Sequence, residues 1–353
     1  MRVFLLLIFI ALARPVFSSE RAVWVTPWDL DTKQKINLLI KDVKSNNLNT
    51  IIAEVRYRGD ALYFPNRENS DYKNEESRYH TLVGNNFDPL LYLSDICKKQ
   101  DIKLIAWVTT FVITSNKIDN IGLEHPYFRY YHWVTVDSLG NTMKHFDREG
   151  AFFDPGVPEV QDYLFNVFMD IVVNYQIDGF QLDYIRYPNA SFGFNPSALE
   201  AYSQGEFASW EEFKISSVAG FVRRFSQHAK SVKPNLEVSA AVFSNYDDAL
   251  RTHSQAWISW LDSGIVDRVY LMAYAKQRVL FEAQMAFAAS FDIADKVVVG
   301  VRAWVDHGRY SASDIVEKME IAQKHGFSSV AFFSYRGIKE KEYFWGLKKV
   351  LNK

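Results

Sequence analysis

The sequence has 353 residues, of which 48% are hydrophobic and 23% charged, a composition typical of a folded globular chain and not of a disordered one. Its 40 basic and 42 acidic residues give a net charge of −2, and no basic stripe indicates nucleic acid as a partner. Aromatic residues make up 16% of the chain. Most such rings are core material, but sugar-binding clefts also use them as flat apolar platforms, so their abundance weakly favours a carbohydrate ligand.

The first 19 residues have the layout of a secretory signal peptide. A basic residue precedes an uncharged run over 3–13, and the small residues Ser18 and Ser19 follow. The apolar run is too short to span a membrane, so we expect no stable membrane insertion after its removal. The pattern predicts a signal peptide at 1–19, one domain over 20–353, and a secreted or periplasmic location.

Strand and helix patterns alternate eight times along the rest of the chain. Short apolar runs predict the strands, and apolar residues at helical spacing predict a helix after each strand. A doubly wound open sheet would carry a glycine-rich turn after its first strand, and TPWDLD stands there instead. The order therefore predicts a single (β/α)8 TIM barrel. In chain order the predicted strand and helix pairs are 23–26 and 32–46, 50–55 and 88–99, 103–109 and 158–175, 179–185 and 210–232, 237–243 and 253–262, 268–274 and 281–291, 296–301 and 312–325, and 329–334 and 343–351.

Loop lengths indicate which end of the barrel carries the functional site. Connections from helix to strand are short, whereas those after strands two, three and four are long, at about 57–87, 110–157 and 186–209. These long loops meet at the C-terminal ends of the strands, where TIM barrels carry their active sites.

The segment DGFQLDYIRYP, residues 178–188, places a carboxylate at that end. Alternation along the strand predicts one face toward the helices and one toward the lumen, the first with Phe180, Leu182 and Tyr184 and the second with Gln181, Asp183 and Ile185. A buried carboxylate is costly unless it is used or paired, so Asp183 is a candidate catalytic residue. The alternative for Asp183 is an ion pair with Arg186 or Arg56. Asp178, at the opposite end of the strand, is expected to be structural.

Cleavage of a glycosidic bond needs a second carboxyl group, which protonates the leaving oxygen. Glu54 alternates onto the same face of the second strand as Ile52 and Arg56, which predicts a position in the lumen. Asp60 follows in the next loop and Asp306 follows the seventh strand. All three acids are candidates, and spacing does not separate them. Glu54 could instead be the ion-pair partner of Arg56.

Other kinds of hydrolytic site lack their sequence signatures. The eight histidines are scattered without HxH or HExxH spacing, and there is no GxSxG elbow or glycine-rich phosphate loop. We therefore expect no metal and no cofactor, which leaves a cofactor-free hydrolase with a polysaccharide or oligosaccharide as its substrate.

Several motifs resemble those of the family-10-like glycosyl hydrolase group, a set of mostly bacterial exported TIM barrels that includes a glycosidase of denuded peptidoglycan. The matching stretches are RAVWVT, NTIIAEVRYRGDALY, FDPL, AWV and, most densely, residues 153–188. The resemblance implies hydrolysis of glycosidic bonds, with peptidoglycan glycan strands among the expected substrates. Carried over position by position, it draws attention to Arg56, Asp60, Trp107, Asp154, Asp183 and Tyr187. Arg186, Tyr274 and Trp304 complete the candidate substrate-binding residues.

Some positions depart from the pattern of that group. Ile105 precedes the AW of strand three, Tyr184 follows Asp183, and Leu271-Met272 stands on strand six. Ile185 occupies the place of the catalytic Glu of chitinase-type barrels, so their substrate-assisted mechanism does not apply. These departures keep open the alternative of a non-catalytic glycan-binding barrel. A lyase on the same scaffold is a second alternative, because fold alone does not fix chemistry.

Overall fold

The computed structural model describes residues 19–304 and 310–351. The predicted signal peptide therefore lies outside the described residues except for Ser19, and so does the candidate acid Asp306. Within the described ranges, no helix is long and apolar enough to cross a membrane.

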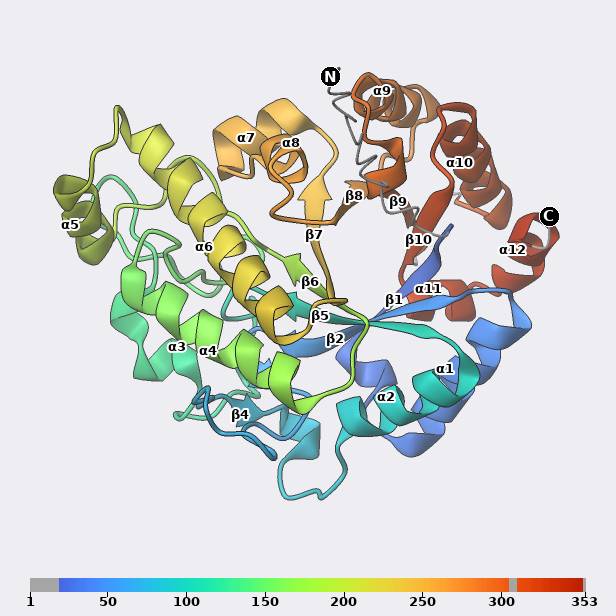
Figure 1. Cartoon of the computed structure of the whole chain (residues 1–353), viewed down its shortest axis with the longest axis horizontal. Helices are drawn as coiled ribbons and strands as arrows, with labels where there is room; N and C mark the ends of the chain where they lie inside the picture. Colours follow the sequence, from blue (N-terminus) through green and yellow to red (C-terminus); the bar gives the residue numbers. More distant parts are fainter. Residues whose placement is uncertain (1–18, 305–309, 352–353) are drawn as a thin grey trace, which may run out of the picture.

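Within these residues, eight parallel strands close into a barrel (Figure 1). The strands pair in the order β1-β2-β5-β6-β7-β8-β9-β10, and β10 pairs with β1 again. The predicted (β/α)8 fold is therefore confirmed, and each predicted strand end lies within two residues of the observed one. The strands are β1 (Arg21–Val25), β2 (Thr50–Tyr57), β5 (Lys103–Thr109), β6 (Gly179–Asp183), β7 (Glu237–Phe243), β8 (Arg268–Ala273), β9 (Val297–Arg302) and β10 (Ser329–Phe333).

Helices surround the strands, and Figure 1 shows α4 and α6 side by side on the outside of the barrel. Local sequence fixes where several of them begin. Asp88 caps α2 through Leu91 N–H at 3.0 Å, with Pro89 in the first turn, and Ser311 forms a capping box with Asp314 in α10. The helices of this layer are α1 (Lys33–Ser45), α2 (Pro89–Gln100), α4 (Pro158–Asn174), α6 (Trp210–Val232), α8 (Trp257–Asp262), α9 (Arg278–Ala289), α10 (Ala312–Lys324) and α12 (Phe344–Leu351).

One predicted helix, 253–262, is divided in the structure. The chain forms α7 (Tyr246–His253) and then α8, because Ser254 adopts a left-handed conformation at φ 56° that ends α7. The loops at the C-terminal ends of the strands also contain short elements that the sequence pattern did not predict. These are β3 (Asp60–Ala61), β4 (Ser77–Arg78), α3 (Pro126–Arg129), α5 (Pro196–Gln204), α11 (Tyr335–Glu340) and the 3-10 turns Pro27–Asp29, His80–Leu82 and Tyr131–Trp133. A further 3-10 turn, Ala294–Lys296, directly precedes β9 at the opposite end of the barrel.

Successive side chains of β6 point alternately to the helix layer and to the barrel lumen. The Phe180 ring packs between the helices, with its centroid 5.4 Å from Phe168 of α4 and 4.7 Å from Phe225 of α6. Its neighbour Gln181 faces the lumen, where it accepts the Trp24 indole N–H at 2.7 Å. The predicted alternation is thus confirmed for this part of the strand, and a packed lumen supports the residues above it.

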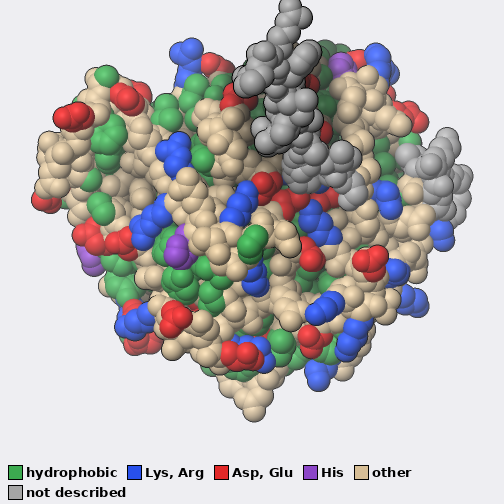
Figure 2. Space-filling model, viewed as in Figure 1, with side chains coloured by type: hydrophobic (Ala, Val, Ile, Leu, Met, Phe, Trp, Pro, Cys, Tyr) green, Lys and Arg blue, Asp and Glu red, His purple; other side chains and the backbone are tan. Residues whose placement is uncertain are grey.

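Acidic and basic side chains are interspersed over the face drawn in Figure 2. That mixture agrees with the near-neutral net charge of −2.

Candidate active site

A cavity of about 320 Å³ opens among the C-terminal ends of the barrel strands. Its walls are largely aromatic, and five charged side chains project into or border it. The aromatic walls include Trp24, Trp28, Trp107, Phe243, Tyr274 and Phe333. The charged residues are Glu54, Arg58, Glu149, Asp183 and Arg186. Concave, mostly apolar sites with a few converging polar groups are the usual form of a ligand site.

Asp183 ends β6 and is 9% exposed. One carboxylate oxygen accepts the Trp107 indole N–H at 3.0 Å, and the other accepts the Tyr184 backbone N–H at 2.7 Å. Burial raises the pKa of Asp183, while these hydrogen bonds and the nearby guanidinium groups of Arg186 and Arg58 act in the opposite direction. The pKa of Asp183 therefore lies above its ordinary value, and these contacts offset only part of the cost of burying its charge.

Glu54 lies on β2 and is 3% exposed. Burial, and then the negative charge of Asp183, raise its pKa well above the ordinary value, and only Arg58 opposes them. Among the described residues, none donates a hydrogen bond to this carboxyl group. Glu54 thus favours its protonated form. Two carboxyl groups of one cavity are placed in environments that separate their ionisation, a pattern that distinguishes acid from base in active sites.

A β-bulge in β2 separates Glu54 from Arg56. Glu54 pairs with Trp107, but Arg56 pairs with Val108, so one extra residue is accommodated between them. The prediction that both residues share a face is therefore wrong. Arg56 points away from the cavity, is 0% exposed, and forms an ion pair with Glu76 at 2.6 Å. This pair also excludes the alternative in which Arg56 neutralises Glu54 or Asp183.

A second break in alternation follows Asp183. Tyr184 has a left-handed backbone at φ 50°, which is unusual for a non-glycine residue. As a result Tyr184 borders the cavity, while Ile185 is fully buried in the core between strands and helices. The predicted faces of Tyr184 and Ile185 are therefore wrong, because the strand ends at Asp183.

Arg58, Glu149 and Tyr184 are cavity residues that sequence reasoning missed. The Arg58 Nη1 donates to the Thr114 carbonyl oxygen at 2.7 Å and to the Glu149 carbonyl oxygen, so it links two long loops. Gly59, the left-handed glycine after Arg58, was the available signal that the chain turns back here.

Arg186 borders the cavity, as its candidacy for substrate binding requires. It forms an ion pair with Glu149 at 2.9 Å and stacks 4.9 Å from the Phe243 ring centroid. Burial would raise the pKa of Glu149, but Arg186 and hydrogen bonds outweigh it, so the pKa is lowered. Glu149 is therefore an ionised partner of Arg186 at this site.

The other candidates fall into two groups. Trp107 and Tyr274 line the cavity. Asp60, Asp154 and Tyr187 are buried outside its lining, and Trp304 packs behind it with its ring 5.1 Å from Tyr274. Asp154 accepts hydrogen bonds from Thr135 Oγ1 at 2.8 Å and Gly156 N–H at 2.9 Å, which tie down its loop.

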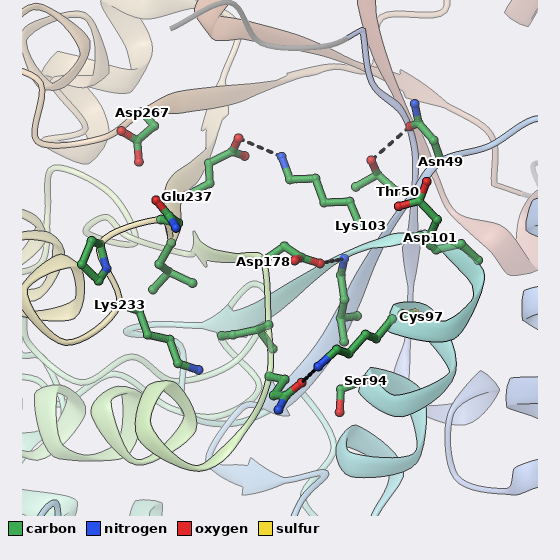
Figure 3. Close-up of a pocket in the computed structure, with 18 of the residues that line it drawn as sticks. Asn49, Thr50, Ser94, Cys97, Asp101, Lys103, Asp178, Lys233, Glu237 and Asp267 are labelled. Atoms are coloured by element: carbon green, nitrogen blue, oxygen red, sulfur yellow. Dashed lines mark hydrogen bonds and ion pairs between the residues drawn. The ribbon is translucent and has the colours of Figure 1, made fainter.

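A larger cavity, of about 930 Å³, lies at the N-terminal ends of the strands (Figure 3). Four lysines and four acids line it. Lys103 Nζ lies 2.8 Å from Glu237 Oε2, and Lys230 Nζ lies 2.6 Å from Asp267 Oδ1. Asp178 accepts the Leu104 N–H at 2.8 Å. These contacts close the barrel floor, the end of a TIM barrel that serves stability.

The sequence matches the family Glycosyl hydrolase-like 10 over residues 19–312. The chain belongs to this family. The resemblance drawn from its motifs is thereby confirmed, and glycan-acting TIM barrels of the hydrolase type are its relatives.

Two curated relatives carry glycosyl hydrolase names. The chain is 23% identical over 267 residues to Glycosyl hydrolase YngK of Bacillus subtilis (strain 168), covering 69% of this chain and 49% of that protein. It is 24% identical over 223 residues to Glycosyl hydrolase DigH of Escherichia coli (strain K12), covering 54% of this chain and 48% of that protein. The matched region thus spans about half the length of these relatives.

Solved structures show the same fold. The glycoside hydrolase domain of PgaB (BpsB) from Bordetella bronchiseptica superposes with a TM-score of 0.73 at 15% identity, over 95% of this chain and 99% of that one. The beta-galactosidase from Bacillus circulans sp. alkalophilus gives 0.62 at 12% identity, over 94% and 55%.

The cavity contains carboxyl groups, indole and phenol rings and guanidinium groups. In the described part of the chain, no three His, Cys, Asp or Glu side chains are grouped as ligands of a metal ion. The groups that are present can donate a proton, accept one, stabilise positive charge and stack on sugar rings.

Proposed function

We propose that this protein is an exported glycoside hydrolase that cleaves a polysaccharide with Glu54 and Asp183 as its paired carboxyl groups. The observation that carries the proposal is the position of both groups in one aromatic cavity. The pKa of Glu54 is raised well above its ordinary value, whereas hydrogen bonds and two guanidinium groups offset part of the cost of burying the Asp183 carboxylate. Glycosidases require this division of roles.

In the proposed reaction the Glu54 carboxyl group donates its proton to the glycosidic oxygen as the bond to the anomeric carbon breaks. Asp183 supports the positive charge that develops on that carbon, and it either attacks the carbon or takes a proton from the attacking water. The Trp107 N–H and Tyr184 N–H hold the Asp183 carboxylate in place throughout. Arg58 and Arg186 balance the negative charge left at the end of the proton transfer.

The substrate that fits the proposal is a glycan chain, and peptidoglycan glycan strands are the first candidate. Aromatic rings such as Trp28 and Tyr274 border the cavity and offer flat faces to sugar rings. The choice of peptidoglycan rests on the resemblance to the family group, and the secreted or periplasmic location rests on the signal-peptide pattern at 1–19.

The experiment compares wild type with Asp183→Asn and Asp178→Asn on peptidoglycan glycan strands and other β-linked polysaccharides. New reducing ends are measured over a range of pH. Asp178 is the matched control, because it belongs to the same segment but lies at the barrel floor. We expect Asp178→Asn to retain turnover and Asp183→Asn to lose it.

Each alternative gives its own result. Undiminished turnover by Asp183→Asn would remove this residue from the mechanism. Saturable glycan binding without new reducing ends at any pH would indicate a binding barrel, and unsaturated products that absorb in the ultraviolet would indicate a lyase.

A further inference from the structure

His125 is a buried side chain that no step of the proposed reaction uses. It is 1% exposed and caps α3, where its Nδ1 accepts the Tyr127 N–H at 3.2 Å. Its Nε2 lies 3.0 Å from the carbonyl oxygen of Arg58. Because Nδ1 accepts a hydrogen bond, the ring proton belongs on Nε2, which donates to Arg58. Burial lowers the pKa of His125 to about 4, so the ring is neutral at neutral pH.

The carbonyl oxygen that accepts the His125 hydrogen bond belongs to a turn with an unfavourable backbone conformation. Arg58 has a left-handed backbone at φ 54°, and Gly59 follows at φ 94°. The Arg58 N–H donates to Thr109 Oγ1 at 2.7 Å, so both backbone groups of this residue are held. A Cβ on Gly59 would lie 2.9 Å from the His125 ring, which shows how closely the ring packs on the turn. Such conformations persist where their surroundings enforce them.

The turn directs the Arg58 guanidinium to the cavity beside Glu54. Arg58 is the cation that opposes the burial of Glu54, and Asp183 is the anion that adds to it. The phenol groups of Tyr57 and Tyr79 also interact electrostatically with Glu54. Arg58 is therefore the charged group that keeps the pKa of Glu54 from rising further.

We propose that His125 is a positioning residue that holds the Arg58 turn and so fixes the cation beside Glu54. The role of Glu54 as general acid rests on the proposed function. The charged groups that face the ring of His125 itself are Asp60, whose Oδ1 lies 3.8 Å from Nε2, and Arg56.

Two substitutions separate the two hydrogen bonds of the ring. His125→Gln keeps a donor at the position of Nε2, whereas His125→Asn keeps the capping acceptor and loses that donor. We expect His125→Asn to lower kcat roughly 10- to 100-fold with little change in KM, since misplaced catalytic groups cost rates of this order. The basic limb of the pH–rate profile of His125→Asn should move to higher pH, because the pKa of Glu54 rises when Arg58 is no longer held beside it. His125→Gln should restore kcat and the limb, and His132→Asn, an exposed histidine of the same loop, should change neither.

A titration that needs no turnover decides the proposal independently. The Glu54 carboxyl stretch is followed by infrared spectroscopy and identified by its loss in Glu54→Gln. An upward move of its midpoint in His125→Asn supports the proposal; an unchanged midpoint, or equal behaviour of the Asn and Gln variants, overturns it. If His125→Asn does not fold, Gly59→Ala is used instead. The added Cβ pushes the His125 ring away from the turn, and the midpoint of the Glu54 titration must again move upward. If the wild type cleaves no glycan, the proposed function is wrong, but the infrared titration still tests whether His125 positions Arg58.

Discussion

Replacing Asp60 with asparagine removes a buried carboxyl group from the loop that follows β2. Asp60 is 7% exposed, and burial followed by the charge of Glu76 raises its pKa from 3.8 to about 8, with Arg56 opposing. A carboxyl group whose pKa rises on folding stabilises the folded state below its unfolded pKa. That stability is lost as the pH rises from 3.8 to about 8.

The size of the effect follows from the shift. One pKa unit corresponds to about 1.4 kcal/mol, so relative to a neutral side chain Asp60 costs about 2 kcal/mol at pH 5 and about 4 kcal/mol at pH 7. Asp60→Asn should therefore be more stable than wild type at both pH values, and the gap should widen by about 1 kcal/mol per pH unit between them.

Urea unfolding at pH 5, 6 and 7 measures this gap, with the exposed Asp119→Asn as control. A gap that does not change with pH, or an Asp60→Asn protein less stable than wild type at pH 7, would refute the reasoning. Because Asp60 lies outside the cavity lining, turnover should stay within about threefold of wild type, the range expected of a group that takes no part in proton transfer. A loss as large as that of Asp183→Asn would return Asp60 to the mechanism.

Three further substitutions test the site and its support. Glu54→Gln should lower kcat by about 10²- to 10⁴-fold in reducing-end assays. It should also raise the melting temperature at pH 7, because a carboxyl group with a raised pKa costs stability above its unfolded pKa. Trp107→Phe removes a donor that lowers the pKa of Asp183, so the acidic limb of the pH–rate profile should move to higher pH. Glu76→Gln leaves the buried Arg56 uncompensated and should cost about 3–5 kcal/mol in urea unfolding; a loss below 1 kcal/mol would contradict that.

Periodicity was enough to predict the barrel, because apolar alternation and helical spacing follow directly from burial. The same reasoning placed Asp183 and Glu54 at the C-terminal ends of strands, and the structure brings them into one cavity. Arg186, Trp107 and Tyr274 join them there, as cavity residues that the sequence had nominated.

The errors arise where alternation stops. Arg56 follows a bulge, Tyr184 is itself left-handed, and Ile185 follows it. Neither the bulge nor the left-handed residue has a signature in apolar spacing. Asp60 was nominated as an acid in the loop after strand two, and Asp154 through the family resemblance, but loop residues are placed by contacts distant in sequence. The partner of Arg56, Glu76, is 20 residues away along the chain. Arg58 was missed because its guanidinium is oriented by a turn and by carbonyl oxygens of other loops.

The bulge in β2 also bears on how relatives should be aligned. Val55 supplies the extra residue, and both it and Arg56 lie on the helix side of the strand, while Glu54 stays in the lumen. A relative that lacks one residue at this point would restore regular pairing and still place its acid inside and its arginine outside. A gap at position 55 is therefore compatible with the same pair of carboxyl groups. A one-residue shift of the whole strand would instead place the arginine in the lumen and the acid on the helix side.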